Sequence, residues 1–422
     1  GLLLLGGRLA DLFGARRTLA TGGGVRGGGS LVAGRAGTVA VELAGRAIQG
    51  VGAALIAPAA LSLLFPLFAH DPRELTRAFA LYGAAAPAGG TAGVFLGGVL
   101  TEWVDWRWVF LINVPVGVVA LLATPGLLPA GALRRGRIDL AGAVTVTAAL
   151  TLAVFAIVRA NEEGWASPLT IGLLAGAAAL LAAFVGVEAA RRDPLVPLSI
   201  FRVPNLSGAN LTMALLGAAW IPMWFFLNLY LQQVLGYGAF EAGAALLPMT
   251  IAIMVLMVGV TGRLVNRLGF VAPSVAGLVI LAVGIGLLAL VPSDGNFAAN
   301  VLPATLVAAL GMSLAYIPVL MASLSGAGPE QSGLASGIVN TTYQVGSALG
   351  LAAMTALATA YGADRIGDAV ALTNGFQAAF WGAAGIALTG AVLALLLLRR
   401  PRGAVEEPSE AEPEREAVSP AS

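Results

Sequence analysis

The 422-residue chain contains no cysteine and no lysine, and its only histidine is His70. Without cysteine there is no disulfide, no thiol nucleophile and no thiolate-bound metal. A nucleotide-binding P-loop needs a lysine to reach the phosphates, so this polypeptide is not an ATP-driven pump of that type. His70 lies in a polar connection without ligand partners, which is typical of a solvated loop residue. We therefore expect no metal site and no cofactor.

Charge is also scarce in this sequence. Only 11% of the residues are charged, against roughly 25% in soluble domains. Hydrophobic residues make up 58% of the chain, and apolar runs of about twenty residues recur, each long enough to cross a ~30 Å hydrocarbon core as a helix. We expect an all-α polytopic membrane protein embedded in the lipid bilayer, with no nucleic-acid partner.

Charged and Pro/Gly-rich stretches divide the sequence into twelve candidate membrane helices and a short apolar stub over residues 1–5. The candidates lie near residues 18–34, 39–65, 78–100, 108–128, 138–158, 168–188, 206–230, 241–261, 272–291, 298–322, 332–360 and 375–398. Five helical residues reach only about 7.5 Å, so the stub is expected to end a helix whose beginning is absent.

The arginine positions predict the orientation. All 23 basic residues are arginines; two lie inside candidate helices, four lie in loops on one side, and the remaining seventeen lie on the other side. The four on the minority side are Arg35, Arg107, Arg159 and Arg365. By the positive-inside rule the majority side is cytoplasmic. We expect a multi-pass protein of the cell membrane with both ends in the cytoplasm.

A pattern at residues 7–14 returns at residues 262–269, with eight candidate helices between the copies. An even number of crossings places both copies on the same side, as a parallel repeat about the membrane normal requires. Two six-helix bundles in direct succession would separate the copies by six helices, so two extra helices are implied. The predicted domains are an N-terminal bundle over 1–128, two linker helices over 129–192, a C-terminal bundle over 193–398 and a disordered cytoplasmic tail over 399–422.

Several motifs resemble the major facilitator superfamily. Residues 7–17 match the loop between its second and third helices, and residues 46–54 match its fourth-helix motif. Residues 105–117 look like the stretch entering helix six in its 14-helix branch, and residues 333–346 resemble helix thirteen. The chain is thus similar to the 14-helix drug:proton antiporters of the EmrB/QacA type, with the first helix and most of the second missing.

The resemblance implies a major facilitator fold and no enzyme activity. It also implies proton-coupled export of small hydrophobic or cationic compounds, that is, multidrug efflux by alternating access. The chain departs from the family where residues 93–98 lack a proline, and where six glycines and Arg26 occupy residues 21–30. A remnant that inserts without transport is the alternative. A membrane-embedded enzyme or receptor is a weaker one, because the intramembrane acids are essentially Glu42 alone. A monomer is expected.

The predicted proton-coupling residues are Arg46 and Glu42. An arginine near the bilayer centre costs ~2.5–3.5 kcal/mol on insertion scales. The two residues stand at i and i+4 and can form an ion pair on one helix face. In the family this arginine faces the central cavity and is tied to proton coupling. A purely structural pair near the outer end of the helix is the plain alternative.

The predicted conformational latch consists of Gly7, Arg8, Asp11, Gly14, Arg16 and Arg17. In the family the acid of this loop caps a neighbouring helix N-terminus or pairs with an arginine. A simple positive-inside loop would explain the arginines but not the acid. Glycines at every fourth position of helix five, which are Gly89, Gly93 and Gly97 followed by Gly98, predict a strip where another helix approaches closely.

The predicted substrate-binding residues are Gln49, Asn210, Trp220, Met223, Trp224, Asn228, Tyr316, Asn340 and Gln344. Aromatic rings and adaptable methionines suit flat lipophilic cations. Aromatic residues also gather at membrane interfaces for reasons unrelated to a substrate. The sequence leaves this choice open for each residue.

Overall fold

The computed structural model describes residues 2–68, 70–129, 139–191, 194–327 and 331–399. All regular structure in these residues is helical. Ten helical segments of this part of the chain are long and apolar enough to cross a membrane. The expected all-helical polytopic architecture is therefore confirmed, and the predicted tail beyond residue 399 lies outside the described residues.

The N-terminal region contains seven helices. They are α1 (Leu2–Phe13), α2 (Ala15–Gly34), α3 (Val39–Ser62), α4 (Leu64–Phe68), α5 (Pro72–Trp103), α6 (Trp108–Leu111) and α7 (Asn113–Leu127). A single residue, Gly14, separates α1 from α2, and its φ of 87° is readily reached only by glycine. Thr38 and Asp71 cap α3 and α5 by accepting hydrogen bonds from backbone N–H groups in the first turn.

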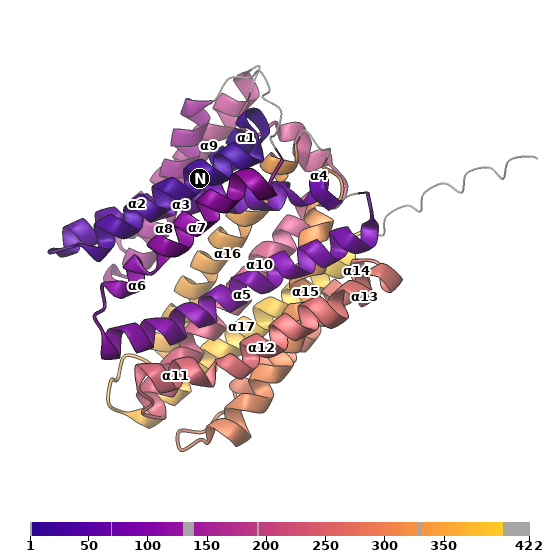
Figure 1. The fold of residues 1–422 in the computed structure, drawn as a ribbon. Helices are drawn as coiled ribbons and strands as arrows, with labels where there is room; N and C mark the ends of the chain where they lie inside the picture. The colour runs from indigo at the N-terminus through magenta and orange to yellow at the C-terminus, as the bar shows by residue number, and fades with distance from the viewer. Residues whose placement is uncertain (1, 69, 130–138, 192–193, 328–330, 400–422) are drawn as a thin grey trace, which may run out of the picture.

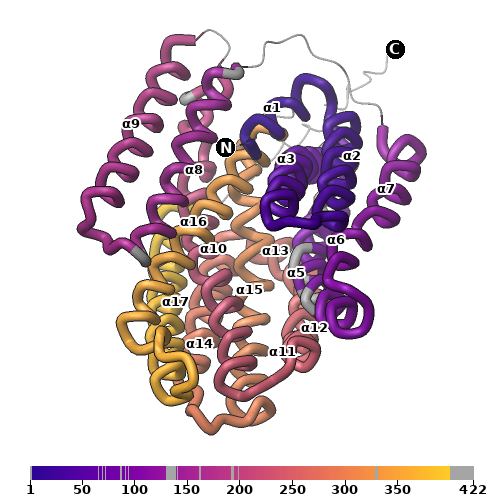
Figure 2. Tube along the Cα trace, turned by 90° about the vertical axis from the view of Figure 1, so that its left-hand side faces the viewer, coloured from indigo at the N-terminus to yellow at the C-terminus, as the bar shows by residue number. Residues whose placement is uncertain are grey.

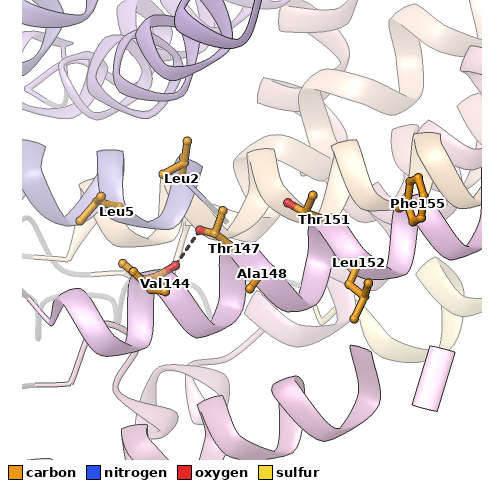
Figure 3. A pocket seen from close by; sticks show the side chains of 9 residues that line it. Leu2, Leu5, Val144, Thr147, Ala148, Thr151, Leu152 and Phe155 are labelled. Atoms are coloured by element: carbon orange, nitrogen blue, oxygen red, sulfur yellow. Dashed lines mark hydrogen bonds between the residues drawn. The ribbon is translucent and has the colours of Figure 1, made fainter. Parts of the chain in front are cut away.

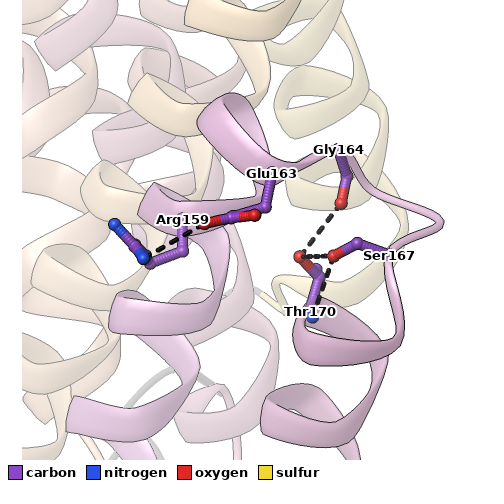
Figure 4. Close-up of polar contacts among 5 residues, drawn as sticks. All are labelled: Arg159, Glu163, Gly164, Ser167 and Thr170. Atoms are coloured by element: carbon purple, nitrogen blue, oxygen red, sulfur yellow. Dashed lines mark hydrogen bonds and ion pairs between the residues drawn. The ribbon is translucent and has the colours of Figure 1, made fainter.

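Two helices, α8 (Leu140–Glu163) and α9 (Pro168–Ala190), form a hairpin in the segment predicted to link two bundles. Their turn is ordered by polar contacts (Figure 4): Thr170 Oγ1 donates to the carbonyl of Gly164 at 3.0 Å, and Ser167 Oγ accepts from the backbone N–H of Thr170 at 3.2 Å. Arg159 pairs with Glu163 one turn apart at 3.1 Å. Figure 2 shows the hairpin along one flank of the molecule, with α2, α3 and α7 on the opposite flank.

The C-terminal region holds most of the core. Its elements are η1 (Leu198–Arg202), α10 (Leu206–Leu229), η2 (Tyr230–Val234), α11 (Ala239–Ala245), α12 (Leu247–Leu256), η3 (Met257–Thr261), α13 (Gly262–Leu268), α14 (Val271–Leu288), η4 (Phe297–Val301), α15 (Leu302–Leu324), α16 (Ser332–Ala360) and α17 (Ala369–Leu397). Helices α10, α14, α15 and α17 pack closely around fully buried rings such as Phe376 and Phe380. By contrast, α5 and α7 are mostly exposed. Figure 1 shows α5 running beside α12.

All twelve candidate segments are helical, although not all meet the criterion for a membrane span. Helices α2 and α16 are long enough but are not among the ten apolar spans. In α2 the cause is composition, because seven glycines and Arg26 replace the apolar side chains of an ordinary span. The division into two six-helix bundles that superpose by rotation stays a prediction.

Candidate functional site

Asp11 caps a helix of the opposite half of the chain. Its Oδ1 accepts from the backbone N–H of Gly333 at 2.8 Å, and its Oδ2 accepts from that of Leu334 at 2.9 Å. Both donors belong to the first turn of α16, where N–H groups have no partner within the helix. A carboxylate there also interacts favourably with the positive end of the helix dipole. This is the geometry that the resemblance implied for the latch acid.

The Asp11 contact depends on glycines on both helices. A Cβ at Gly7 would collide with the backbone of Gly333, and a Cβ at Gly337 would lie 2.8 Å from the Leu3 carbonyl oxygen. The absence of side chains therefore lets the two backbones touch.

The arginines of the predicted latch are placed differently from Asp11. Arg16 donates to the carbonyl of Leu128 at 3.1 Å. Arg8 is half-buried, and Arg17 is exposed. The structure thus brings Gly7 and Asp11 to α16, whereas Arg16 ties the start of α2 to the end of α7.

The second copy of the repeat makes the corresponding contact. Asn266 of α13 occupies the position equivalent to Asp11, and its Oδ1 accepts from Thr76 Oγ1 of α5 at 3.1 Å. Gly269, equivalent to Gly14, also has a positive φ, 72°. Each copy therefore binds the N-terminal part of a helix in the other half, with a charged acceptor in one copy and a neutral one in the other.

The expected pair of Glu42 and Arg46 does not form in the described residues. Instead, the Arg46 guanidinium lies over the ring of Phe110 on α6, 5.9 Å from its centroid, which is within cation–π range. Glu42 stands in the first turn of α3, where the helix dipole favours an acid without any ion pair. The i,i+4 spacing allowed the pair, but the neighbouring aromatic ring is the partner of the arginine.

Gln49 belongs to the contact between α2 and α3, away from the aromatic cavity described next. Its Nε2 donates to Ser30 Oγ at 2.8 Å. A Cβ at Gly29 would lie 2.7 Å from the Gln49 backbone nitrogen, and one at Gly52 would lie 2.7 Å from the Gly22 carbonyl oxygen. Part of the glycine richness of α2 thus serves close packing against α3.

A cavity of about 360 Å³ lies between α5, α10, α15 and α16. Its lining consists of Gly83, Gly90, Trp220, Ile221, Trp224, Met312, Tyr316, Tyr343 and Gln344. The rings of Tyr316 and Tyr343 meet edge to face, with centroids 5.9 Å apart. The lining carries aromatic faces, one amide and no ionised side chain.

The cavity contains four of the nine predicted substrate-binding residues, namely Trp220, Trp224, Tyr316 and Gln344. Sequence reasoning missed Tyr343 as a lining residue. Its position directly before Gln344, as an aromatic ring in a helix of small residues, was the available signal.

The other predicted substrate residues have structural contacts instead. Asn210 is buried and accepts from Thr342 Oγ1 at 3.0 Å. Met223 is wholly buried in the core. Asn228 accepts from Gln232 of the next turn. Asn340 donates to a carbonyl within its own helix.

The glycine strip of α5 is open along most of its length. A Cβ at Gly89, Gly93 or Gly97 would have no described atom within 4 Å, whereas one at Gly98 would lie 3.3 Å from the backbone of Phe240 on α11. The expectation of close packing along the whole strip is therefore wrong for the described residues, because only its end has a neighbouring helix.

A larger cavity, of about 560 Å³, lies between α1 and α8 (Figure 3). Leu2, Leu5 and Phe155 make it apolar, with hydroxyls from Thr147 and Thr151. The Thr147 hydroxyl donates to a carbonyl of its own helix. A third cavity of about 290 Å³ shares Thr151 with this one and Gln344 with the aromatic cavity.

Comparison with known proteins shows the family and the fold. The family model described as Major Facilitator Superfamily matches residues 1–351 and, separately, residues 317–421. The chain is 40% identical over 404 residues to the cephamycin export protein CmcT of Amycolatopsis lactamdurans, covering 94% of this chain and 82% of that protein. It is 36% identical over 420 residues to the puromycin resistance protein pur8 of Streptomyces alboniger, covering 96% and 83%. The crystal structure of the human organic anion transporter MFSD10 (TETRAN) has a TM-score of 0.66 at 18% identity, covering 93% of this chain and 80% of that chain, and shows the fold alone.

Proposed function

Because the chain belongs to the Major Facilitator Superfamily, we propose that it exports small hydrophobic or cationic compounds in exchange for protons. The observation that carries the proposal is the aromatic cavity, which is bounded by α5 of one half and by α10, α15 and α16 of the other. A compound held there contacts both halves, so rocking of one half against the other would change the side to which it is exposed. The names of the relatives, a cephamycin export protein and a puromycin resistance protein, support a small organic substrate.

The cavity lining favours flat, lipophilic compounds. Tryptophan and tyrosine faces stack on planar rings and attract cations, and Met312 adapts to different shapes. Gln344 provides the amide that can fix the orientation of a ligand. Because no carboxylate lines the cavity, a cation is held there by aromatic faces rather than by an ion pair.

The contact of α1 with α16 is the proposed conformational latch. Asp11 accepts hydrogen bonds from two backbone N–H groups at the start of α16 only while the two helices are in contact. Separating the halves on this side exposes those donors, so the contact favours closure of the face that carries the loop. The arginine distribution supports a cytoplasmic position for this face.

Proton coupling is proposed to involve Arg46. A carboxylate changes its proton affinity when an arginine approaches or leaves it. Glu42 lies on the same rigid helix as Arg46, so their separation hardly changes between states. The acid that responds to Arg46 is therefore proposed to lie on another element than α3. Insertion without coupled transport is the competing proposal.

The test is efflux of fluorescent lipophilic compounds from cells that express the chain. Replacing Trp224 with Ala should change efflux of different compounds unequally, by roughly two- to tenfold, because each compound uses the aromatic face differently. Trp381→Ala is the matched control, since Trp381 is 55% exposed on α17. A uniform loss that follows reduced expression would contradict substrate contact at Trp224.

A further inference from the structure

Two buried carboxylates meet where the hairpin of α8 and α9 begins and ends, outside the aromatic cavity. Asp139 precedes α8 and is 2% exposed, and Glu188 lies near the end of α9 and is 3% exposed. The outer end of the same hairpin has an ordinary solvated ion pair, Arg159 with Glu163, whose side chains are 39% and 43% exposed. The two acids at the base are therefore in a different environment.

Each acid uses one oxygen and leaves the other without a partner. Asp139 Oδ1 accepts from the backbone N–H of Gly142 at 2.9 Å and pairs with Arg191 Nη1 at 3.3 Å. Glu188 Oε2 accepts from the backbone N–H of Val196 at 2.7 Å. Asp139 Oδ2 and Glu188 Oε1 are buried and have no hydrogen-bond partner in the described structure.

The two unpartnered oxygens point to the same place. A Cβ at Gly142 would lie 2.9 Å from Asp139 Oδ2 and would collide with Glu188 Oε1. Glycine thus leaves the space in which both oxygens converge. Two unpartnered acceptors that face each other repel unless a donor lies between them.

The charges of this cluster do not balance when both acids are ionised. Arg191 is the charged side chain that contacts the pair among the described residues, and it pairs with Asp139 alone. Helix α1, which packs against α8, carries Arg8 and Asp11, and α16, which also contacts α8, carries no charged residue. Within the described residues, one negative charge therefore stays buried without compensation, which is unfavourable.

We propose that Asp139 and Glu188 form a buried proton-binding site in which one proton from the solvent is shared between Glu188 Oε1 and Asp139 Oδ2. The proton provides the missing donor, satisfies both oxygens and makes the cluster with Arg191 neutral. No bond other than the O–H bond forms or breaks. Through Asp139 and Glu188, the site connects the start of α8 and the end of α9 to Val196, in the segment that leads to α10. Its protonation therefore determines how strongly the hairpin is attached to the C-terminal half.

Protonation of this site has a defined effect on stability. The folded chain binds one proton that is released on unfolding, so stability falls as the pH rises through the range in which the folded site loses that proton. For the full chain in lipid nanodiscs, followed by tryptophan fluorescence, the melting temperature should fall by roughly 1–3 °C per pH unit from mildly acidic to mildly alkaline conditions. Glu188→Gln replaces the shared proton by an amide N–H donor and should flatten this dependence.

A control variant and a spectroscopic measurement complete the test. Glu163→Gln removes an exposed carboxylate of the same hairpin, so its melting temperature should depend on pH as that of the wild type does. Infrared spectra of the wild type at neutral pH should show a protonated carboxyl C=O band that disappears in Glu188→Gln and in Asp139→Asn. An unchanged spectrum together with identical pH slopes in wild type and Glu188→Gln would overturn the proposal. Stabilisation by added Na⁺ at alkaline pH, without the band, would overturn it in favour of a metal cation.

Discussion

The glycine strips of α16 and α5 have similar spacing and different surroundings. On α16, Gly346 and Gly350 lie against the backbone of α10, where a Cβ would collide with Ala214 and Ala218. On α5, a Cβ at Gly89, Gly93 or Gly97 would have no described atom within 4 Å. Glycine spacing therefore indicates where a helix can approach, whereas the presence of a partner helix decides whether it does.

The repeat relates the two strips to each other. Asp11 binds the start of α16, and its equivalent, Asn266, binds Thr76 near the start of α5, so α5 and α16 occupy corresponding places. The helix that lies on the glycine strip of α16 is α10. Corresponding places in the repeat therefore do not guarantee corresponding packing.

The largest expected effect concerns Arg46. Arg46→Ala should abolish proton-driven efflux of lipophilic cations, because the coupling acid then loses the guanidinium that shifts its proton affinity. Efflux from energised cells, with and without a protonophore, measures this loss. Protonophore-sensitive efflux that persists in Arg46→Ala would show that the coupling site is elsewhere.

The next effect compares the two strips directly. Gly350→Val should prevent α10 from packing on α16 and destabilise the fold by about 3 kcal/mol or more, since backbone cannot move aside as a side chain can. Gly93→Val in the 422-residue chain should change stability by less than about 1 kcal/mol, because the added methyl groups meet open space. Thermal unfolding in detergent measures both variants.

The outcome that would contradict this comparison is simple. Equal losses of stability in Gly93→Val and Gly350→Val would show that the strip of α5 is packed as tightly as that of α16.

Sequence reasoning predicted the helices well and the side-chain partners unevenly. The apolar runs place the helices because lipid leaves the backbone no alternative but internal hydrogen bonds. The role of Asp11 as a cap was also predicted, since an acid, tight glycines and a helix start are local signals. The ring of Phe110 beside Arg46 was not, because that contact depends on how α6 packs against α2 and α5.

The cavity shows the same limit. Trp220 and Met223 are one turn apart on α10, yet only Trp220 lines the cavity while Met223 is buried in the core. A helix with apolar residues on every side gives no period from which the cavity face can be chosen. Contacts with α15 and α16 make that choice, and one sequence does not reveal them.

The smallest expected effect separates the two copies of the repeat. Asp11→Asn keeps one acceptor oxygen but loses the charge and one hydrogen bond at the start of α16, which should weaken the closed contact by about 1 kcal/mol. Asn266→Ala loses a single neutral bond to Thr76 and should weaken the contact of α13 with α5 by less. Because the chain has no cysteine, Ser336→Cys, buried beside the contact on α16, can report its opening by maleimide labelling. Asp11→Asn should raise the labelling rate about fivefold, and Asn266→Ala should raise it less; an equal or larger increase for Asn266→Ala would show that the charge of Asp11 adds nothing to the latch.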